Sequence, residues 1–235
     1  MGLPLYLAMT APELSAAEAL PNHLAYMACL FSPYNTGLSN CPQKLPEGSM
    51  LILNDSTPAG GHDPKLIGRQ IAEISQQFRC SSVLLDFQRP DNELTCKIAE
   101  AILSAVSCPV AVSEGYATHL DCPVFLSAPP ADCLLQRWLS PWKDREIWLE
   151  AALDTRNVTL DKAGCQVSPA NPCDPHLLPH RSEQLHCHYK IKPEQKQVCF
   201  TLQRTGGDLK QLLAEAETLG VVGAVGLYQE LGLLL

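Results

Sequence analysis

Apolar residues in this chain gather in short runs that alternate with segments of helical periodicity. The runs that read as buried strands are residues 3–9, 24–31, 50–53, 82–87, 109–113, 123–127, 146–153 and 221–228. Between them, apolar residues recur at helical spacing in segments 12–20, 63–78, 94–106, 132–139 and 208–219. In the second of these helices, Asp63 fits the N-cap position and Pro64 the first helical position.

Strands that are apolar on both faces and separated by helices are typical of a parallel sheet covered on both sides. Eight strands in 235 residues match the strand number of a (β/α)8 barrel, which has roughly 250 residues. The alternative is an open doubly wound sheet, but no glycine-rich phosphate-binding turn follows any strand. We therefore expect the α/β class, as a single TIM-barrel domain over residues 1–235.

The alternation is interrupted over residues 154–205. This segment is rich in Pro, Cys and His up to residue 188, and then two β-like runs, 188–191 and 197–202, flank Pro193-Glu194-Gln195. Two such runs around a short turn are typical of a β-hairpin. We expect a hairpin insertion between the seventh and eighth barrel strands.

Composition narrows the class of partner. The chain has 17 Lys and Arg against 25 Asp and Glu, a net charge of −8 without a basic cluster, which disfavours nucleic acid and anionic membranes as partners. No apolar run approaches the ~18 residues of a membrane span, and the start lacks the basic region of a signal peptide. The 11 Cys are scattered without a C-x-x-C motif, which favours reduced thiols over a disulfide framework. We expect a cytoplasmic protein, and the composition leaves its oligomeric state open.

Chemistry in a (β/α)8 barrel takes place at the carboxyl ends of the strands. Here those ends carry hydroxyl, amide and carboxylate side chains: Thr10, Ser32, Tyr34, Asn54, Asp55, Asp86, Gln88, Arg89, Ser113, Glu114, Ser127, Glu150, Tyr228, Gln229 and Glu230. Such a rim suits a neutral polyhydroxyl ligand, although polar strand ends also occur simply because loops face water. Trp148 shares a strand face with Glu150, which predicts an aromatic side chain inside the barrel below that carboxylate.

The fourth expected strand reads Ser81-Ser82-Val83-Leu84-Leu85-Asp86-Phe87-Gln88 and follows a helix that ends in QQFRC. Further on come Tyr189, Val198-Cys199-Phe200, the helix LKQLLAEAETLG and the glycine-rich strand GAVGLYQELG. In both places the chain resembles glycoside hydrolase family 18, the chitinase-like barrels, and most of all its spore-cortex and peptidoglycan-acting branch. That family's fourth strand ends in D-x-x-D-x-D-x-E.

The resemblance implies a hydrolase whose motif-closing Glu protonates the glycosidic oxygen, while the substrate's own N-acetyl oxygen is the nucleophile. Here the acid position holds Gln88, which has no proton to donate. The outer acidic positions hold Ser81 and Leu84, so that only Asp86 remains of the motif. The Met-x-Tyr-Asp of the sixth strand in the family is also absent, because this strand reads Phe125-Leu126-Ser127-Ala128-Pro129.

We therefore expect a family 18-like barrel without its general acid, a pseudoenzyme that binds an amino-sugar or peptidoglycan fragment. Strand alternation turns Asp86 and Gln88 toward the barrel interior, and Glu114 and Glu230 are the candidate substitutes for the missing acid. Tyr228 is expected either to stack on a sugar ring or to cap the barrel. The expected ligand-binding residues are Tyr34, Asn54, Asp55, Asp86, Gln88, Glu150, Tyr228 and Glu230.

Two alternatives remain: an enzyme of different chemistry that uses the rim carboxylates, with or without zinc, and a structural or partner-binding barrel. No cofactor or metal is required by the first hypothesis. The candidate zinc ligands are Cys173, His176, His180, His186 and His188, whose short spacing is compatible with a tetrahedral site. Three prolines and the lack of a standard zinc-finger spacing favour an exposed loop instead.

Overall fold

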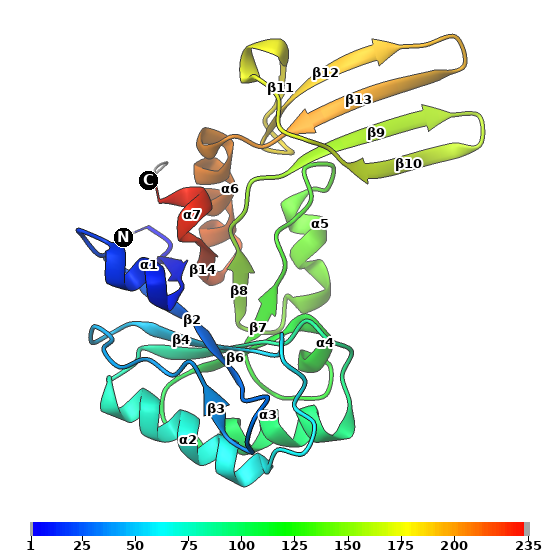
Figure 1. Ribbon diagram of the computed structural model, residues 1–235. Coiled ribbons are helices and arrows are strands. Elements are labelled where there is room, and N and C mark those ends of the chain that lie inside the picture. The colour runs from blue at the N-terminus through cyan, green and yellow to red at the C-terminus, as the bar shows by residue number, and fades with distance from the viewer. Residues whose placement is uncertain (1, 233–235) are drawn as a thin grey trace.

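The computed structural model describes residues 2–232 and contains a closed barrel of eight parallel strands (Figure 1). The strands are β1 (Leu5–Met9), β2 (Leu24–Phe31), β4 (Met50–Asn54), β5 (Ser82–Asp86), β6 (Val110–Ser113), β7 (Val124–Leu126), β8 (Ile147–Glu150) and β14 (Val221–Leu227). Each pairs in parallel with its neighbour along the chain, β14 pairs with β1, and β1 pairs with β2 to close the ring. The predicted (β/α)8 class is confirmed. A short antiparallel strand, β3 (Leu38–Ser39), extends the sheet beside β2.

The long helices that cover the barrel are α2 (Pro64–Gln77), α3 (Glu93–Ala105) and α6 (Gly206–Thr218). Asp63 caps α2 by accepting the backbone N–H of Lys65, as the sequence predicts. Shorter segments complete the layer: α1 (Ala11–Ala16), α4 (Glu114–Ala117), α5 (Leu135–Leu139), α7 (Tyr228–Leu231) and the 3-10 turn Ser140–Trp142. A second 3-10 turn, Pro175–Leu177, lies between β10 (Gly164–Pro169) and β11 (His180–Ser182). Within residues 2–232, no helix combines the length and the hydropathy that crossing a membrane would need.

Both faces of the barrel strands are buried, which explains their near-continuous apolar sequences. The side chains that fill the interior are Tyr6, Ala8, Ala25, Met50, Ile52, Leu84, Ala111, Phe125, Trp148 and Val225. The alternate residues, such as Leu53, Val83 and Leu85, pack with the α2 and α3 residues Ile67, Ile71 and Ile98. Trp148 lies inside the barrel as expected, with its ring 5.8 Å from that of Tyr6.

Between β8 and α6 the chain forms five antiparallel strands where one hairpin was expected. They are β9 (Thr155–Asp161), β10 (Gly164–Pro169), β11 (His180–Ser182), β12 (Cys187–Pro193) and β13 (Gln197–Gln203), arranged in the order β10-β9-β13-β12-β11. The predicted runs 188–191 and 197–202 fall in β12 and β13, which pair with each other. This sheet, called the arm below (residues 155–203), projects away from the barrel (Figure 1).

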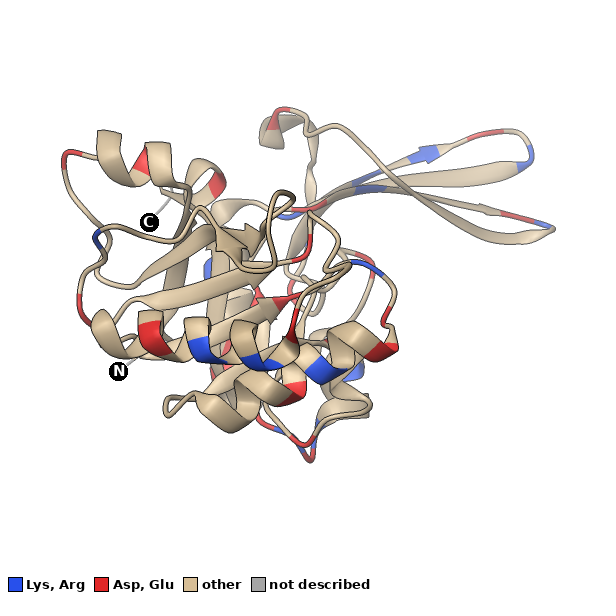
Figure 2. Cartoon of the chain, turned by 60° about the horizontal axis from the view of Figure 1, so that its bottom comes forward, with Lys and Arg blue, Asp and Glu red and all other residues tan. Residues whose placement is uncertain are grey.

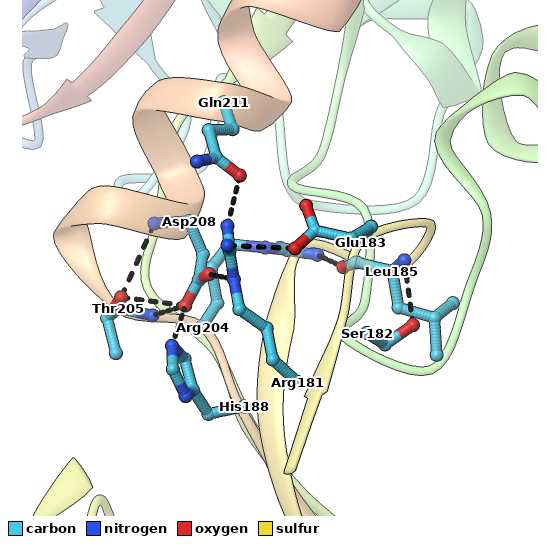
Figure 3. A network of polar contacts seen from close by, with 9 residues as sticks. All are labelled: Arg181, Ser182, Glu183, Leu185, His188, Arg204, Thr205, Asp208 and Gln211. Carbon is cyan, nitrogen blue, oxygen red and sulfur yellow. Dashed lines mark hydrogen bonds and ion pairs between the residues drawn. The ribbon is translucent and has the colours of Figure 1, made fainter.

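A partly buried network of polar and charged side chains joins the arm to α6 (Figure 3). Asp208, only 1% exposed, accepts hydrogen bonds from the backbone N and Oγ1 of Thr205, and its Oδ1 lies 3.3 Å from Arg181 Nε of the arm. His188 Nε2 lies 3.8 Å from the other carboxylate oxygen of Asp208. Arg204, also 1% exposed, donates to the carbonyl oxygen of Pro129 at 2.6 Å. Asp208 and Arg204 are out of water, whereas Arg181 and His188 are partly exposed, so the buried carboxylate of Asp208 depends most on its hydrogen bonds and on Arg181.

Candidate functional site

The carboxyl ends of the barrel strands surround a cavity of ≈ 560 Å³. Its wall includes the polar residues Asn54, Asp55, Ser56, Asp86, Gln88, Arg89 and Glu150 above the apolar residues Met27, Ile52, Leu84, Phe125 and Val225. A second cavity of ≈ 640 Å³ shares Asp86, Gln88, Arg89, Phe125 and Glu150 with the first and extends past Ser113, Glu114, Tyr116 and Ser127. Because they share these walls, we treat the two cavities as one site, the barrel cleft.

Asp86 and Gln88 meet in this cleft. Asp86 ends β5, and the amide Nε2 of Gln88 donates a hydrogen bond to Asp86 Oδ1. Burial raises the pKa of Asp86; the bond from Gln88 opposes this rise, and the nearby Asp55 adds to it. The pair therefore joins an exposed amide to a half-buried carboxyl that holds its proton more readily than usual.

Asp55 fixes the backbone that carries Gln88. Its carboxylate is 1% exposed and accepts the backbone N–H groups of Gln88 at 2.8 Å and Arg89 at 3.0 Å. Arg89 returns a hydrogen bond from Nε to the carbonyl oxygen of Asp55 at 2.8 Å, and a second from Nη2 to that of Ser56 at 2.9 Å. The segment after β5 is thus tied to the segment after β4, which holds the Gln88 side chain at the cleft.

Glu150 supplies the other carboxyl group of the cleft. It ends β8, and its Oε2 accepts the backbone N–H of Ala128 at 3.0 Å. Burial raises the pKa of Glu150, and the charges of Asp86 and Glu230 raise it further. Two carboxyl groups with raised pKa values therefore lie in one cleft, an arrangement that can hold or transfer a proton near a bound ligand.

The structure brings together six of the polar residues predicted for the site. Asn54, Asp55, Asp86, Gln88 and Glu150 line the first cavity, and Glu114 lines the second, where it accepts a hydrogen bond from Ser127 Oγ at 3.4 Å. Asn54 also supports β2, because its Nδ2 donates to the carbonyl oxygens of Met27 at 3.0 Å and Cys29 at 3.3 Å.

Three predicted ligand residues line neither cavity. Tyr34 is 94% exposed in the loop after β2. Tyr228 is half-buried at the start of α7, where its ring packs against the apolar core. Glu230 accepts the backbone N–H of Leu153 and so supports the segment after β8.

Phe125 and Met27 belong to the cleft although neither was predicted as a ligand residue. Phe125 lines both cavities and presents an apolar surface beside Asp86 and Glu150. Phe125 occupies an interior-facing position of β7, and strand alternation in the sequence could have predicted that its side chain faces the cleft.

The candidate zinc ligands are not gathered at one point. Among residues 2–232 there is no group of three or more His, Cys, Asp or Glu side chains arranged to hold a metal ion. His186 pairs with Glu215, His188 faces Asp208, and the His180 ring lies 5.2 Å from that of Tyr189.

The chain matches known proteins by its structure but not by its sequence. No protein-family model and no curated protein matches the chain. The spore cortex-lytic enzyme SleL of Bacillus cereus superposes with a TM-score of 0.55 at 9% identity, over 95% of this chain and 70% of that one. A family 18 N-acetylglucosaminidase from Paenibacillus barengoltzii gives 0.56 at 9% identity, over 95% and 94% of the two chains. The fold is that of the family 18 glycoside hydrolases.

A family 18 chitinase from Cycas revoluta also matches, with a TM-score of 0.55 at 10% identity over 95% of this chain and 94% of that one. It was solved as a doubly substituted variant, one change being Glu to Gln, in complex with (GlcNAc)4. In the present family 18 fold, β5 is the fourth strand of the barrel, and Gln88 follows it.

Proposed function

We propose that this family 18 barrel binds an amino-sugar oligosaccharide or peptidoglycan fragment in the barrel cleft and does not cleave it by the family reaction. The observation that carries the proposal is Gln88, which follows the fourth barrel strand and is hydrogen-bonded to Asp86 in the cleft. The resemblance assigns the general acid to this position.

The chemistry of Gln88 argues against hydrolysis. A neutral amide donates hydrogen bonds but does not release a proton to a leaving group, and loss of a general acid alone typically removes ~10²–10⁴-fold of the rate. The residues after β7 are Ser127 and Ala128, so the Tyr-Asp pair that the resemblance implies for this strand is absent as well.

The cleft nevertheless suits a sugar. Its two cavities, ≈ 560 and ≈ 640 Å³, fall within the roughly 300–1,000 Å³ of ordinary ligand sites. Phe125 offers an apolar surface to the C–H face of a pyranose ring, while Gln88, Asn54 and Glu150 offer hydrogen-bonding groups. The Cycas chitinase supports this proposal, because a Glu-to-Gln variant of that enzyme holds a bound oligosaccharide.

The proposal is tested by calorimetry with N-acetylglucosamine oligosaccharides and muropeptides, with product analysis by mass spectrometry in parallel. We expect binding without product release, and Gln88→Ala should weaken binding by about fivefold, since one hydrogen bond to the ligand is worth about 1 kcal/mol. Gln76→Ala, which removes an exposed amide from α2, is the matched control and should bind as the wild type does.

Two results decide against the proposal: absence of binding to every sugar, or release of products by the wild-type protein. Gln88→Glu adds the positive test, because it places a carboxyl group next to Asp86. If the family geometry is retained, this variant should hydrolyse a bound oligosaccharide slowly.

A second candidate function is an enzyme of different chemistry that uses Asp86 and Glu150. The raised pKa values of both carboxyl groups in one cleft favour it. This candidate would be selected over the binding function if the wild type turns over a substrate, Glu150→Gln loses that activity and Gln88→Ala keeps it.

A further inference from the structure

Two cysteine side chains face each other beside the second barrel strand. Cys29 lies on β2 and is fully buried, and Cys41 lies half-buried in the segment that follows β3. Both are reduced thiols, and a hydrogen bond joins them. Two thiols in contact can be converted to a disulfide by exchange with another disulfide.

The path of the chain after β3 brings the two thiols together. Because β3 pairs antiparallel with the end of β2, the residues after β3 run back along β2 toward Cys29. Asn40 adopts a left-handed φ of 54°, and its carbonyl oxygen accepts a hydrogen bond from Tyr26 Oη at 2.6 Å. Cys41 is thereby held against β2, where it packs on the apolar cluster that contains Cys29.

The two thiols differ in reactivity. The hydrogen bond to Cys41 raises the pKa of Cys29, and burial adds to this rise. At Cys41 the same hydrogen bond lowers the pKa and outweighs the opposing effect of burial. Because the thiolate is the nucleophile in disulfide exchange, Cys41 is the thiol that should react first.

Cys41 also lines a cavity of ≈ 520 Å³, whose wall includes Ser15 of α1, Tyr26 of β2, and Gln43 and Lys44. Acidic residues are distributed over the barrel and its helices (Figure 2), but the part of this wall that lies within residues 2–232 has one Lys and no Asp or Glu. Ordinary ligand sites measure roughly 300–1,000 Å³, so the cavity has room for a small anionic molecule beside Cys41.

We propose that Cys29 and Cys41 form a dithiol site that reduces a low-molecular-weight anionic disulfide, of which glutathione disulfide is the probe. The Cys41 thiolate attacks one sulfur atom of the reagent, whose S–S bond breaks and releases the first thiolate. Cys29 passes its proton to that thiolate and attacks Cys41 Sγ, which releases the second thiolate. The second thiolate takes up the proton that Cys41 lost on ionising. The two protein thiols are oxidised to one disulfide, and the reagent is reduced to two thiols.

Other cysteines of the chain supply internal comparisons. Cys80 and Cys108 also lie close enough to interact, but burial raises the pKa of both. Cys165 is exposed on β10, where its partner on the neighbouring strand is Leu160. The first case is a pair without a reactive thiol, and the second is an accessible thiol without a second thiol opposite it.

Mass spectrometry of the full chain after treatment with glutathione disulfide at neutral pH tests the proposal. The reaction is stopped with acid, remaining thiols are alkylated, and trypsin then releases residues 1–44 as one peptide that contains Cys29 and Cys41 and no other cysteine. We expect this peptide to escape alkylation and to be lighter than its reduced form by two hydrogen atoms. Cys165 should instead keep bound glutathione.

Three variants separate the steps. Cys29→Ala removes the second thiol, so Cys41 should accumulate bound glutathione. Cys41→Ala removes the first nucleophile and should leave Cys29 reduced. Cys165→Ala is the matched control, and its peptide 1–44 should be oxidised at the wild-type rate. Circular dichroism melts show whether each variant retains the fold.

The wild-type chain alone can overturn the proposal. It fails if the peptide with Cys29 and Cys41 is alkylated while Cys165 carries glutathione, because the reagent has then reacted with an ordinary thiol and not with the pair. It also fails if Cys80 and Cys108 are oxidised as fast, since their reaction should be at least about tenfold slower. A folded Cys29→Ala variant without glutathione on Cys41 would contradict the assigned order of attack.

Discussion

A single methyl group at Gly223 should destabilise the barrel. Gly223 lies on β14 opposite Trp148 of β8, and the Trp148 ring occupies the barrel interior. A Cβ atom at position 223 would lie 2.8 Å from Trp148 Cε3 and 2.9 Å from Cη2, and would overlap Cζ3 as well. Ordinary contacts between carbon atoms are about 3.5–4.0 Å, so either the ring or the strand must move in Gly223→Ala.

The expected magnitude is the difference of two effects. Overpacking a well-filled core costs about 1–3 kcal/mol, whereas replacing Gly by Ala restricts the unfolded chain and returns about 0.4–1 kcal/mol. The net loss should be about 1–2 kcal/mol of unfolding free energy, which lowers the melting temperature by roughly 2–8 °C in a chain of this size. Urea unfolding followed by tryptophan fluorescence measures it.

Two variants make this prediction specific. Gly115→Ala has open space around the added Cβ and should not lose stability. Trp148→Phe removes the ring atoms that Gly223→Ala would strike, so the double variant should be more stable than the sum of the two single effects implies. Strictly additive effects, or a Gly223→Ala variant as stable as the wild type, would refute the steric reasoning.

Three further outcomes follow from the polar groups. Asp208→Ala should cost about 1–3 kcal/mol in urea unfolding, because it removes the buried carboxylate that accepts hydrogen bonds from Thr205 and pairs with Arg181; a loss of about 0.5 kcal/mol or less, as expected for the exposed pair of Lys97 and Glu93, would contradict this. Asp55→Ala should reduce sugar binding by more than about tenfold in calorimetry, since the Asp55 carboxylate holds the backbone of Gln88. The circular dichroism spectrum should stay unchanged. Unchanged affinity would show that this support is dispensable. The pKa of Asp86 is raised above its ordinary value of 3.8. The carboxyl group therefore stabilises the fold below pH 3.8, and this contribution is lost as the pH rises through the raised pKa. Over that range of pH, Asp86→Asn should gain stability relative to the wild type. A difference that does not vary with pH would contradict that assignment.

The barrel strands were predictable because both of their faces are buried. β5 was expected over 82–87 and spans Ser82–Asp86, and α2 begins after the Asp63 cap as its spacing indicates. By contrast, every residue of β10 is exposed and only Thr155 of β9 is fully buried, so burial imposes little pattern on these two strands. Their pairing depends on neighbouring strands, which the local sequence does not reveal.

The candidate site likewise has residues that were predictable from the sequence and residues that were not. Asp86 and Glu150 end strands, so the barrel geometry alone directs them to the cleft. Tyr34 and Tyr228 follow strands too, but their positions depend on where the chain turns next. Tyr228 begins a helix that folds back on the core, and Tyr34 lies in a loop that leaves the cleft. Local sequence specifies the end of a strand better than the path of the loop beyond it.

The pairing of β1 with β14 has a consequence for how the protein forms. These strands come from opposite ends of the described chain, and Leu5 lies beside Ala224 only when the ring is complete. A nascent chain on the ribosome can assemble α2 against α3 and the antiparallel pairs β9–β10 and β12–β13 from local contacts, but β1 must wait for β14 to be synthesised. Until then, β1 and β8 present unpaired edges that other chains can join. The barrel should therefore close late and slowly, after its last strand, β14, has been made.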